Sequence, residues 1–102
     1  MLFRSDIQPP HEAEHCYHVY NQYVIRVLNG KRDELKKALD EKGIANAIYY
    51  PLCLHQQVCF ADLGYKIGDF PVSEQAADEV LALPIMTHQA DEVIAAMQGV
   101  FS

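Results

Sequence analysis

The sequence predicts an α+β fold in which about three strands form a small sheet, with three to four helices packed on it. Two observations carry this prediction. Aromatic and β-branched residues alternate with polar residues across residues 16–27, which is the period of a half-buried strand. Later segments repeat apolar residues every three or four positions, which is the period of amphipathic helices, and Gly or Pro separates them. The predicted order is β-α-β-α-α-β-α, typical of one small sheet covered by helices.

The first strand is predicted at residues 16–27, after a lead-in that occupies residues 1–14. The lead-in contains Pro9-Pro10, which favours extended backbone, and a single domain is expected to fill residues 15–102. Aromatic and β-branched residues dominate the strand, and one of its two faces is almost wholly apolar. That face collects the core candidates Tyr17, Val19, Tyr23, Ile25 and Val27.

A helix and a second strand are predicted next. The helix covers residues 31–43, with Leu35 and Leu39 on its apolar stripe, and Gly43 ends it because glycine readily adopts the left-handed conformation of a helix end. Residues 44–51 are predicted as the second strand, which Pro51 ends.

The second half of the chain predicts a short helix at residues 54–64, a loop, a helix at 71–80, a strand at 81–85 and a last helix at 88–101. Gly64 is the expected end of the first of these helices. Pro71 suits the first position of the second, where its missing N–H costs nothing. Pro84 places the third strand at a sheet edge or at a strand end.

The composition argues against several classes of partner. The net charge is −6, and no Lys or Arg follows Lys66, so the C-terminal third lacks the clustered cations that bind nucleic acid or an anionic membrane. No apolar stretch reaches the roughly 18 to 20 residues that span a bilayer. The N-terminal residues lack the apolar segment of a secretory signal, so a cytoplasmic location is expected. The three cysteines have no C-x-x-C spacing and are expected to be reduced thiols.

Residues 11–15, HEAEH, match H-E-x-x-H, a pattern in which two histidines one helical turn apart bind zinc. The match lacks its helical context, because Pro9-Pro10 precedes it and strand-like alternation follows it. In an extended chain His11 and His15 lie roughly 13 Å apart, too far to share a metal. We therefore expect a polar surface segment and no metal site. The open alternative is a weak adventitious site, formed by His11, His15, Cys16 and His18.

Three segments of the chain resemble one enzyme family. They are YNQYVIRV at residues 20–27, RDELKKALDEKGIANAIYYPLCLHQQ at 32–57 and FPVSEQAADEVLALPI at 70–85. In this order and spacing they resemble the C-terminal domain of the DegT–DnrJ–StrS family of nucleotide-sugar aminotransferases, which use pyridoxal phosphate (PLP). The resemblance runs from about Tyr17 to Phe101 and covers only the last part of a typical family member.

The resemblance implies a fold and a reaction. The fold is the small domain of the aspartate-aminotransferase-like PLP enzymes. The reaction converts a ketone on a nucleotide-linked sugar to an amine, with an amino acid as donor, for polysaccharide or lipopolysaccharide biosynthesis. In the family, PLP and its Schiff-base lysine belong to a large N-terminal domain. None of the five lysines here lies in an apolar setting, so we expect this chain alone to bind no cofactor and to supply no catalytic residue.

Candidate substrate-binding residues lie in YYPLCLH at residues 49–55. By resemblance this stretch faces the sugar, with Tyr50 at the family tyrosine and His55 at the histidine of a P-L-H segment. Tyr49 stands where the family often has histidine, so it keeps a hydrogen-bonding tip without a group that titrates near neutral pH. Polar-tipped aromatic residues at a strand end also suit the mouth of a ligand site. The alternative is that both tyrosines are amphipathic residues at a domain edge.

Arg26, on the first predicted strand, is the fourth candidate. A guanidinium group can bind a carboxylate through two parallel hydrogen bonds, and an amino-acid donor carries such a carboxylate. The alternative is a salt bridge between Arg26 and an acidic residue on a nearby helix.

The chain is therefore interpreted as a small domain that forms one wall of a substrate cleft. Its expected partner is a large PLP-binding domain, and the apolar surface that such a domain covers favours a homo-oligomer. The alternative interpretation is a stand-alone regulatory or small-ligand-binding module that kept the fold without catalysis.

Overall fold

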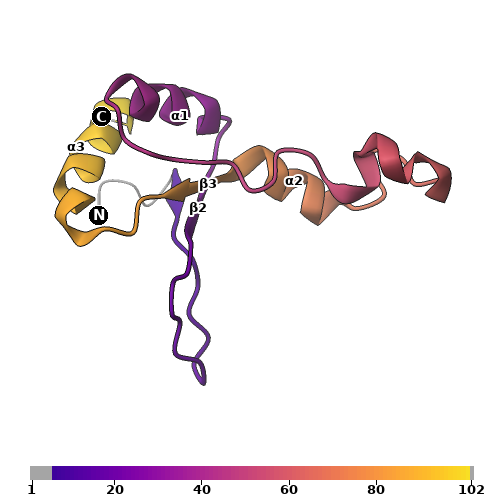
Figure 1. Ribbon diagram of the computed structural model, residues 1–102, viewed down its shortest axis with the longest axis horizontal. Helices are drawn as coiled ribbons and strands as arrows, with labels where there is room; N and C mark the ends of the chain where they lie inside the picture. Colours follow the sequence, from indigo (N-terminus) through magenta and orange to yellow (C-terminus); the bar gives the residue numbers. More distant parts are fainter. Residues whose placement is uncertain (1–5, 102) are drawn as a thin grey trace.

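The computed structural model describes residues 6–101. Within them a small antiparallel sheet lies beside α-helices and short 3-10 helices (Figure 1). The strands are β1 (Ile7–Gln8), β2 (Tyr23–Val27) and β3 (Val80–Leu83). The α-helices are α1 (Arg32–Glu41), α2 (Pro71–Glu79) and α3 (Ala90–Phe101). The 3-10 helices are η1 (Leu54–Gln56), η2 (Val58–Leu63) and η3 (Thr87–Gln89).

The strands are ordered β1-β2-β3, so β2 lies in the middle and pairs antiparallel with both neighbours. Ile25 pairs with Leu81 on one side, and Val27 pairs with Ile7 on the other. Alternate residues of a strand point to the same face. Ile25 and Val27 are accordingly both buried, as the alternation predicts.

The hydrophobic core lies between the sheet, α1 and α3, which together we call the body. Helices α1 and α3 contact each other, and α1 also contacts β3. The end of α1 forms as the sequence predicts: Gly43 adopts φ +71°, and the next residue, Ile44, is buried and donates its N–H to the carbonyl of Leu39 at 2.9 Å. The most deeply buried side chains are Ile25, Val27, Leu35, Leu39 and Leu81.

The strand predicted at residues 16–27 is wrong in its first half, because only Tyr23–Val27 pairs in the sheet. Backbone needs a hydrogen-bonded neighbour to form a sheet, and β1 and β3 flank only the second half. Tyr20 also adopts φ +48°, which extended backbone does not allow. Residues 9–22 instead form an excursion that projects away from the body, with Tyr17 and Val19 exposed rather than in the core (Figure 1).

The strand predicted at residues 44–51 is reduced to one bridge, in which Ala47 exchanges two backbone hydrogen bonds with Ala82. The neighbouring Asn46 side chain binds the carbonyl of Ile44, the carboxylate of Asp40 and the ammonium of Lys36. Such local side-chain bonds compete with a sheet ladder.

The helix predicted at residues 54–64 is divided into η1 and η2, because Gln57 between them has extended backbone. Gly64 ends η2 with φ +80°, and Pro71 is the first residue of α2, both as predicted. Strand β3 ends at Leu83, directly before Pro84. With the three-stranded sheet and its helices, these elements confirm the α+β fold class.

Residues 49–79, which hold η1, η2 and α2, form a side lobe that extends away from the sheet (Figure 1). Arg32 at the start of α1 ties this lobe to the body, because its guanidinium donates to the carbonyls of Ala77 and Val80 at 2.8 and 3.2 Å. None of the helices within residues 6–101 has the length and apolar character needed to cross a bilayer.

Candidate substrate-binding site

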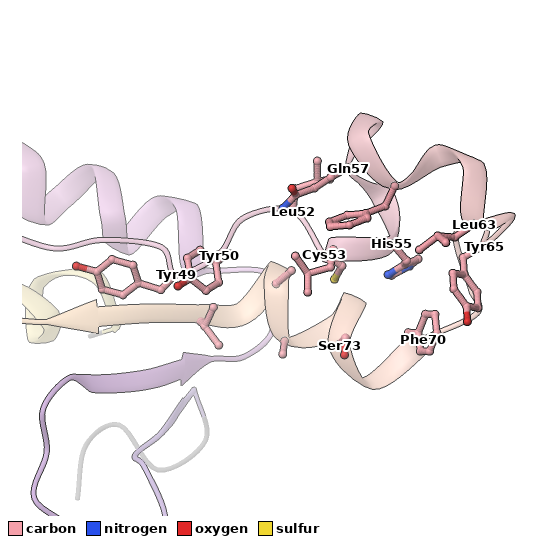
Figure 2. Close-up of a pocket in the computed structure, with 15 residues that line it drawn as sticks. Tyr49, Tyr50, Leu52, Cys53, His55, Gln57, Leu63, Tyr65, Phe70 and Ser73 are labelled. Atoms are coloured by element: carbon pink, nitrogen blue, oxygen red, sulfur yellow. The ribbon is translucent and has the colours of Figure 1, made fainter.

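A cavity of about 630 Å³ lies in the side lobe, between residues 49–65 and α2 (Figure 2). Three of the four site residues predicted from the sequence line it, namely Tyr49, Tyr50 and His55. The remaining lining is mostly apolar, with a few polar side chains, which is the usual character of a small-molecule site. It consists of Leu52, Cys53, Leu54, Gln57, Phe60, Leu63, Tyr65, Phe70, Ser73, Ala76, Ala77 and Val80.

Tyr49 and Tyr50 lie at the end of the cavity nearest the sheet (Figure 2). The peptide bond that joins them is cis, and their rings meet edge to face with centroids 6.3 Å apart. Tyr49 is 44% exposed and Tyr50 is 77% exposed. Neither hydroxyl makes a hydrogen bond within the described residues, so both tips are available to a polar ligand.

His55 lies at the opposite end of the cavity, with Phe70 and Tyr65 (Figure 2). Its ring centroid is 4.8 Å from that of Phe70, and the Phe70 and Tyr65 centroids are 5.0 Å apart. The His55 side chain is only 7% exposed. Its Nε2 atom lies 3.5 Å from Oε2 of Glu74 but makes no hydrogen bond. The imidazole is therefore held in place by aromatic packing and faces a carboxylate.

Glu74 holds the loop that brings Phe70 to this cluster. Its carboxylate accepts hydrogen bonds from the backbone N–H of Gly68 at 2.7 Å and of Phe70 at 3.0 Å. Phe70 is the N-cap residue of α2, so the second bond satisfies a backbone N–H at the start of the helix. The residue therefore organises the wall of the cavity around His55.

Arg26, the fourth predicted site residue, is not brought to the cavity. It lies on β2, and its guanidinium forms an ion pair with Glu79 of α2, with 2.7 Å between the closest atoms. The approach is close but poorly aligned, because Oε1 of Glu79 and Nε of Arg26 are buried without a hydrogen-bond partner. The structure thus shows the helix salt bridge, the second of the two roles that the sequence left open.

Sequence reasoning missed Tyr65 and Phe70 as residues of the cavity wall. Tyr65 and Phe70 flank the loop residues KIGD, which carry no periodic signal. Aromatic residues on both sides of a glycine-containing loop, just before a helix-starting proline, are the signal that could have identified them.

The chain's own residues do not fit the lysine-linked PLP of the family. No lysine is among the residues that line this cavity or the second cavity, described below. Lys36 binds Asp40 and Asn46, Lys31 lies over the ring of Phe101, and Lys66 is in the exposed loop before Phe70. A Schiff base needs a lysine in a shielded pocket, where its pKa falls enough to leave a free amine.

Residues 11–15 do not form the helix that the H-E-x-x-H pattern requires, since only a turn at residues 14–15 interrupts irregular backbone. His18 of the same excursion stacks on Tyr20 at 4.1 Å, and its Nδ1 accepts the Tyr20 N–H at 2.9 Å. Among residues 6–101, no three His, Cys, Asp or Glu side chains are grouped as metal ligands would be.

A second apolar cavity, of about 860 Å³, lies between the sheet and α3. Tyr23 and Ile25 from β2, and Val93, Ile94 and Met97 from α3, contribute to its lining. Ile94 of α3 is 44% exposed here. The body therefore also presents an apolar surface that nothing in the described chain covers.

Comparison with known proteins links this fold to sugar aminotransferases. The chain is 51% identical over 83 residues to the "pleiotropic regulatory protein" of Geobacillus stearothermophilus, covering 81% of this chain and 22% of that protein. It is 42% identical over 94 residues to the UDP-N-acetyl-3-dehydro-α-D-glucosamine 3-aminotransferase of Acidithiobacillus ferrooxidans, covering 92% of this chain and 24% of that enzyme. The chain thus spans about a quarter of the length of the curated relatives it matches.

A solved structure also matches the fold of this chain. S. venezuelae DesV, in complex with a ketimine intermediate, superimposes with a TM-score of 0.83 at 31% identity, over 92% of this chain and 26% of DesV. The sequence profile of the DegT/DnrJ/EryC1/StrS aminotransferase family matches residues 3–100. The chain belongs to the DegT/DnrJ/EryC1/StrS aminotransferase family.

Proposed function

We propose that this chain is the C-terminal domain of a PLP-dependent aminotransferase acting on nucleotide-linked keto-sugars, and that its cavity forms one wall of the substrate cleft. The observation that carries the proposal is the convergence of Tyr49, Tyr50 and His55 on one cavity. Two phenol tips and an imidazole at opposite ends of an apolar hollow suit a ring that has apolar faces and several hydroxyl groups. The printed activity of the A. ferrooxidans relative, a 3-aminotransferase of a UDP-sugar, supports this substrate class.

The proposed partner of the chain is a large PLP-binding domain. Large apolar side chains of the side lobe are exposed to solvent, including Val58 at 91% and Ile67 at 82%. Exposed apolar patches of this kind mark contact surfaces. The same surface supports self-association of the chain by itself, which size-exclusion chromatography with light scattering would measure.

Arg26 is left out of the proposed substrate contacts. Glu79 already pairs with its guanidinium, so a donor carboxylate would have to displace that ion pair. The amino-acid donor is therefore assigned to the rest of the proposed enzyme.

The first test is a titration of the ¹⁵N-labelled chain with UDP-N-acetylglucosamine, followed by NMR. We expect amide shifts at Tyr49, Tyr50 and His55, with a dissociation constant in the range of about 1 mM because one wall buries only part of the ligand. Tyr50→Ala and His55→Ala should weaken binding several-fold. Val58→Ala, on the exposed side of η2, is the matched control. Shifts confined to the excursion at residues 9–22, or no shifts at all, would contradict the proposal.

The second test concerns activity of the chain alone, which we propose to be absent. When the chain is incubated with PLP, no lysine-linked absorbance band that borohydride abolishes should form, since no lysine lines the cavity. Formation of such a band, or amino transfer by the purified chain, would overturn this part of the proposal.

A second candidate function is a regulatory module that kept the fold without catalysis. The observation that favours it is the names of two relatives, the pleiotropic regulatory protein of G. stearothermophilus and the erythromycin biosynthesis sensory transduction protein EryC1 of Saccharopolyspora erythraea. The open reading frame distinguishes the two candidates. An upstream region encoding a lysine-bearing PLP domain supports the enzyme, and a native start at Met1 supports the module.

A further inference from the structure

The side chains of His55 and Glu74 are both largely buried and lie close together. The position of His55 in the cavity wall does not explain this close approach. Nε2 of His55 is buried without a hydrogen-bond partner, and the nearest carboxylate oxygen, Oε2 of Glu74, is 3.5 Å away. The two side chains are 7% and 15% exposed, so little water reaches the space between them. A buried polar atom without a hydrogen bond lowers the stability of the fold. The loss is smaller when the charge on that atom is opposite in sign to the charge on its neighbour.

Glu74 is fixed as an acceptor. Its two oxygens already accept the backbone N–H groups of Gly68 and Phe70, and it lies in the first turn of α2, where the helix dipole favours a negative charge. An ionised carboxylate has no proton to donate. A bare nitrogen lone pair on His55 would therefore lie 3.5 Å from a negative oxygen, whereas a proton on Nε2 places positive charge near that oxygen, although the separation is too long for a hydrogen bond.

The position of this proton determines the protonation state of the other ring nitrogen, Nδ1. A neutral imidazole carries one proton, so a proton on Nε2 leaves Nδ1 as an acceptor. Nδ1 of His55 makes no hydrogen bond within the described residues, and it is not among the buried atoms that lack a partner. Nδ1 therefore keeps some accessible surface on a side chain that lines the cavity, while packing against Phe70 holds the ring plane.

We propose that Glu74 is a positioning residue that keeps the proton of His55 on Nε2, so that Nδ1 presents a hydrogen-bond acceptor to the cavity. This end of the cavity then selects a ligand group that donates a hydrogen bond, such as a hydroxyl, and disfavours a carbonyl or phosphate oxygen. Identifying that group as a sugar hydroxyl rests on the proposed function. The tautomer itself does not.

The test is a long-range ¹H–¹⁵N spectrum of the chain carrying ¹⁵N-labelled histidine, at about pH 8.5, where histidine is ordinarily neutral. His55→Gln assigns the signal by removing it. We expect the Nε2–H pattern for His55 in the unaltered chain. In Glu74→Gln the neutral amide can donate or accept, so both tautomers should appear. Asp78→Asn removes one charge from an exposed position on the same helix and should leave the pattern unchanged.

An Nδ1–H pattern in the unaltered chain overturns the inference, and so does an identical pattern in Glu74→Gln. If Glu74→Gln does not fold, the tautomer pattern of the unaltered chain by itself tests the inference.

Titration with UDP-N-acetylglucosamine separates this inference from the proposed function. We expect Glu74→Gln to weaken binding about fivefold to tenfold, the loss of one well-placed hydrogen bond. Absence of binding with the Nε2–H pattern intact refutes only the proposed function. Binding without a preferred tautomer refutes only the role of Glu74.

Discussion

The body and the side lobe are built from similar side chains but packed in opposite ways. In the body, Leu35, Leu39 and Leu81 are completely buried. In the lobe, no apolar residue from 49 to 76 is buried, although leucine, valine, tyrosine and phenylalanine are frequent there. Burial of apolar surface is the main favourable term in folding. The body therefore holds the fold together, and the lobe holds the candidate site.

The lobe keeps its shape through local contacts. Glu74 fixes the loop before α2, His55 and Tyr65 pack on Phe70, and Gly64 ends η2. Each such contact contributes about 1 kcal/mol, whereas a buried leucine side chain contributes about two to three times as much. Regions held in this way open locally at low free energy. We accordingly expect the body and the lobe to differ in stability, and three predictions test that difference.

The largest expected effect comes from identical substitutions in the two regions. Leu81→Ala removes a side chain from the centre of the core and should lower the free energy of unfolding by about 2–5 kcal/mol. Leu54→Ala, where the side chain is 69% exposed, should change it by about 0.5 kcal/mol or less. Urea unfolding followed by circular dichroism measures both. Equal losses would mean that the lobe belongs to the same cooperative core.

A second matched pair uses two glycines at helix ends. Gly43 and Gly64 have φ values of +71° and +80°, and an added Cβ meets no atom within 4 Å at either position. Alanine there costs about 1 kcal/mol through the backbone alone. Gly43→Ala should lower the global stability by that amount, because α1 is part of the body. Gly64→Ala should instead speed hydrogen exchange of the η2 amides without moving the global transition. A global shift from both would erase the distinction.

The smallest effect is electrostatic and lies at the surface of the body. Hydrogen bonds from Asn46 and, second, from Lys36 lower the pKa of Asp40. A carboxylate whose pKa is depressed in the folded state adds stability above its unfolded pKa and loses it as pH falls through the folded pKa. Asn46→Ala should therefore raise the pKa of Asp40 and flatten the acid side of the stability curve. A ¹³C NMR titration of the Asp40 carboxyl measures this. An unchanged titration midpoint would remove Asn46 as the cause.

The body could largely be predicted from the sequence, because periodicity reports which residues share a buried face. Ile25, Val27, Leu35 and Leu39 follow from it directly. Its errors have local causes: β1 spans two residues next to Pro9-Pro10, too short for a period, and side-chain bonds of Asn46 replace a ladder that periodicity predicts.

The candidate site was only half predictable. Tyr49, Tyr50 and His55 follow from family resemblance, and the two tyrosines also from their place at the end of a predicted strand. The approach of Phe70 and Glu74 to His55, and of Tyr65 to Phe70, depends on how a loop folds back against α2. Neither the helical nor the strand period of apolar residues reports the path of a loop. The pairing of Arg26 with Glu79 likewise requires the packing of α2 beside β2, which is tertiary information.

The chain leaves the body for the side lobe beside β3 and returns from the lobe directly into β3. On the outgoing side Ala47 is bonded to Ala82, and on the returning side Arg32 donates to the carbonyl of Val80. Leu81, between these two anchor points, is the centre of the core. A displacement of the lobe therefore acts on β3, which carries Leu81, and also on β2 and α1 through the contacts of Arg26 with Glu79 and of Arg32 with Ala77.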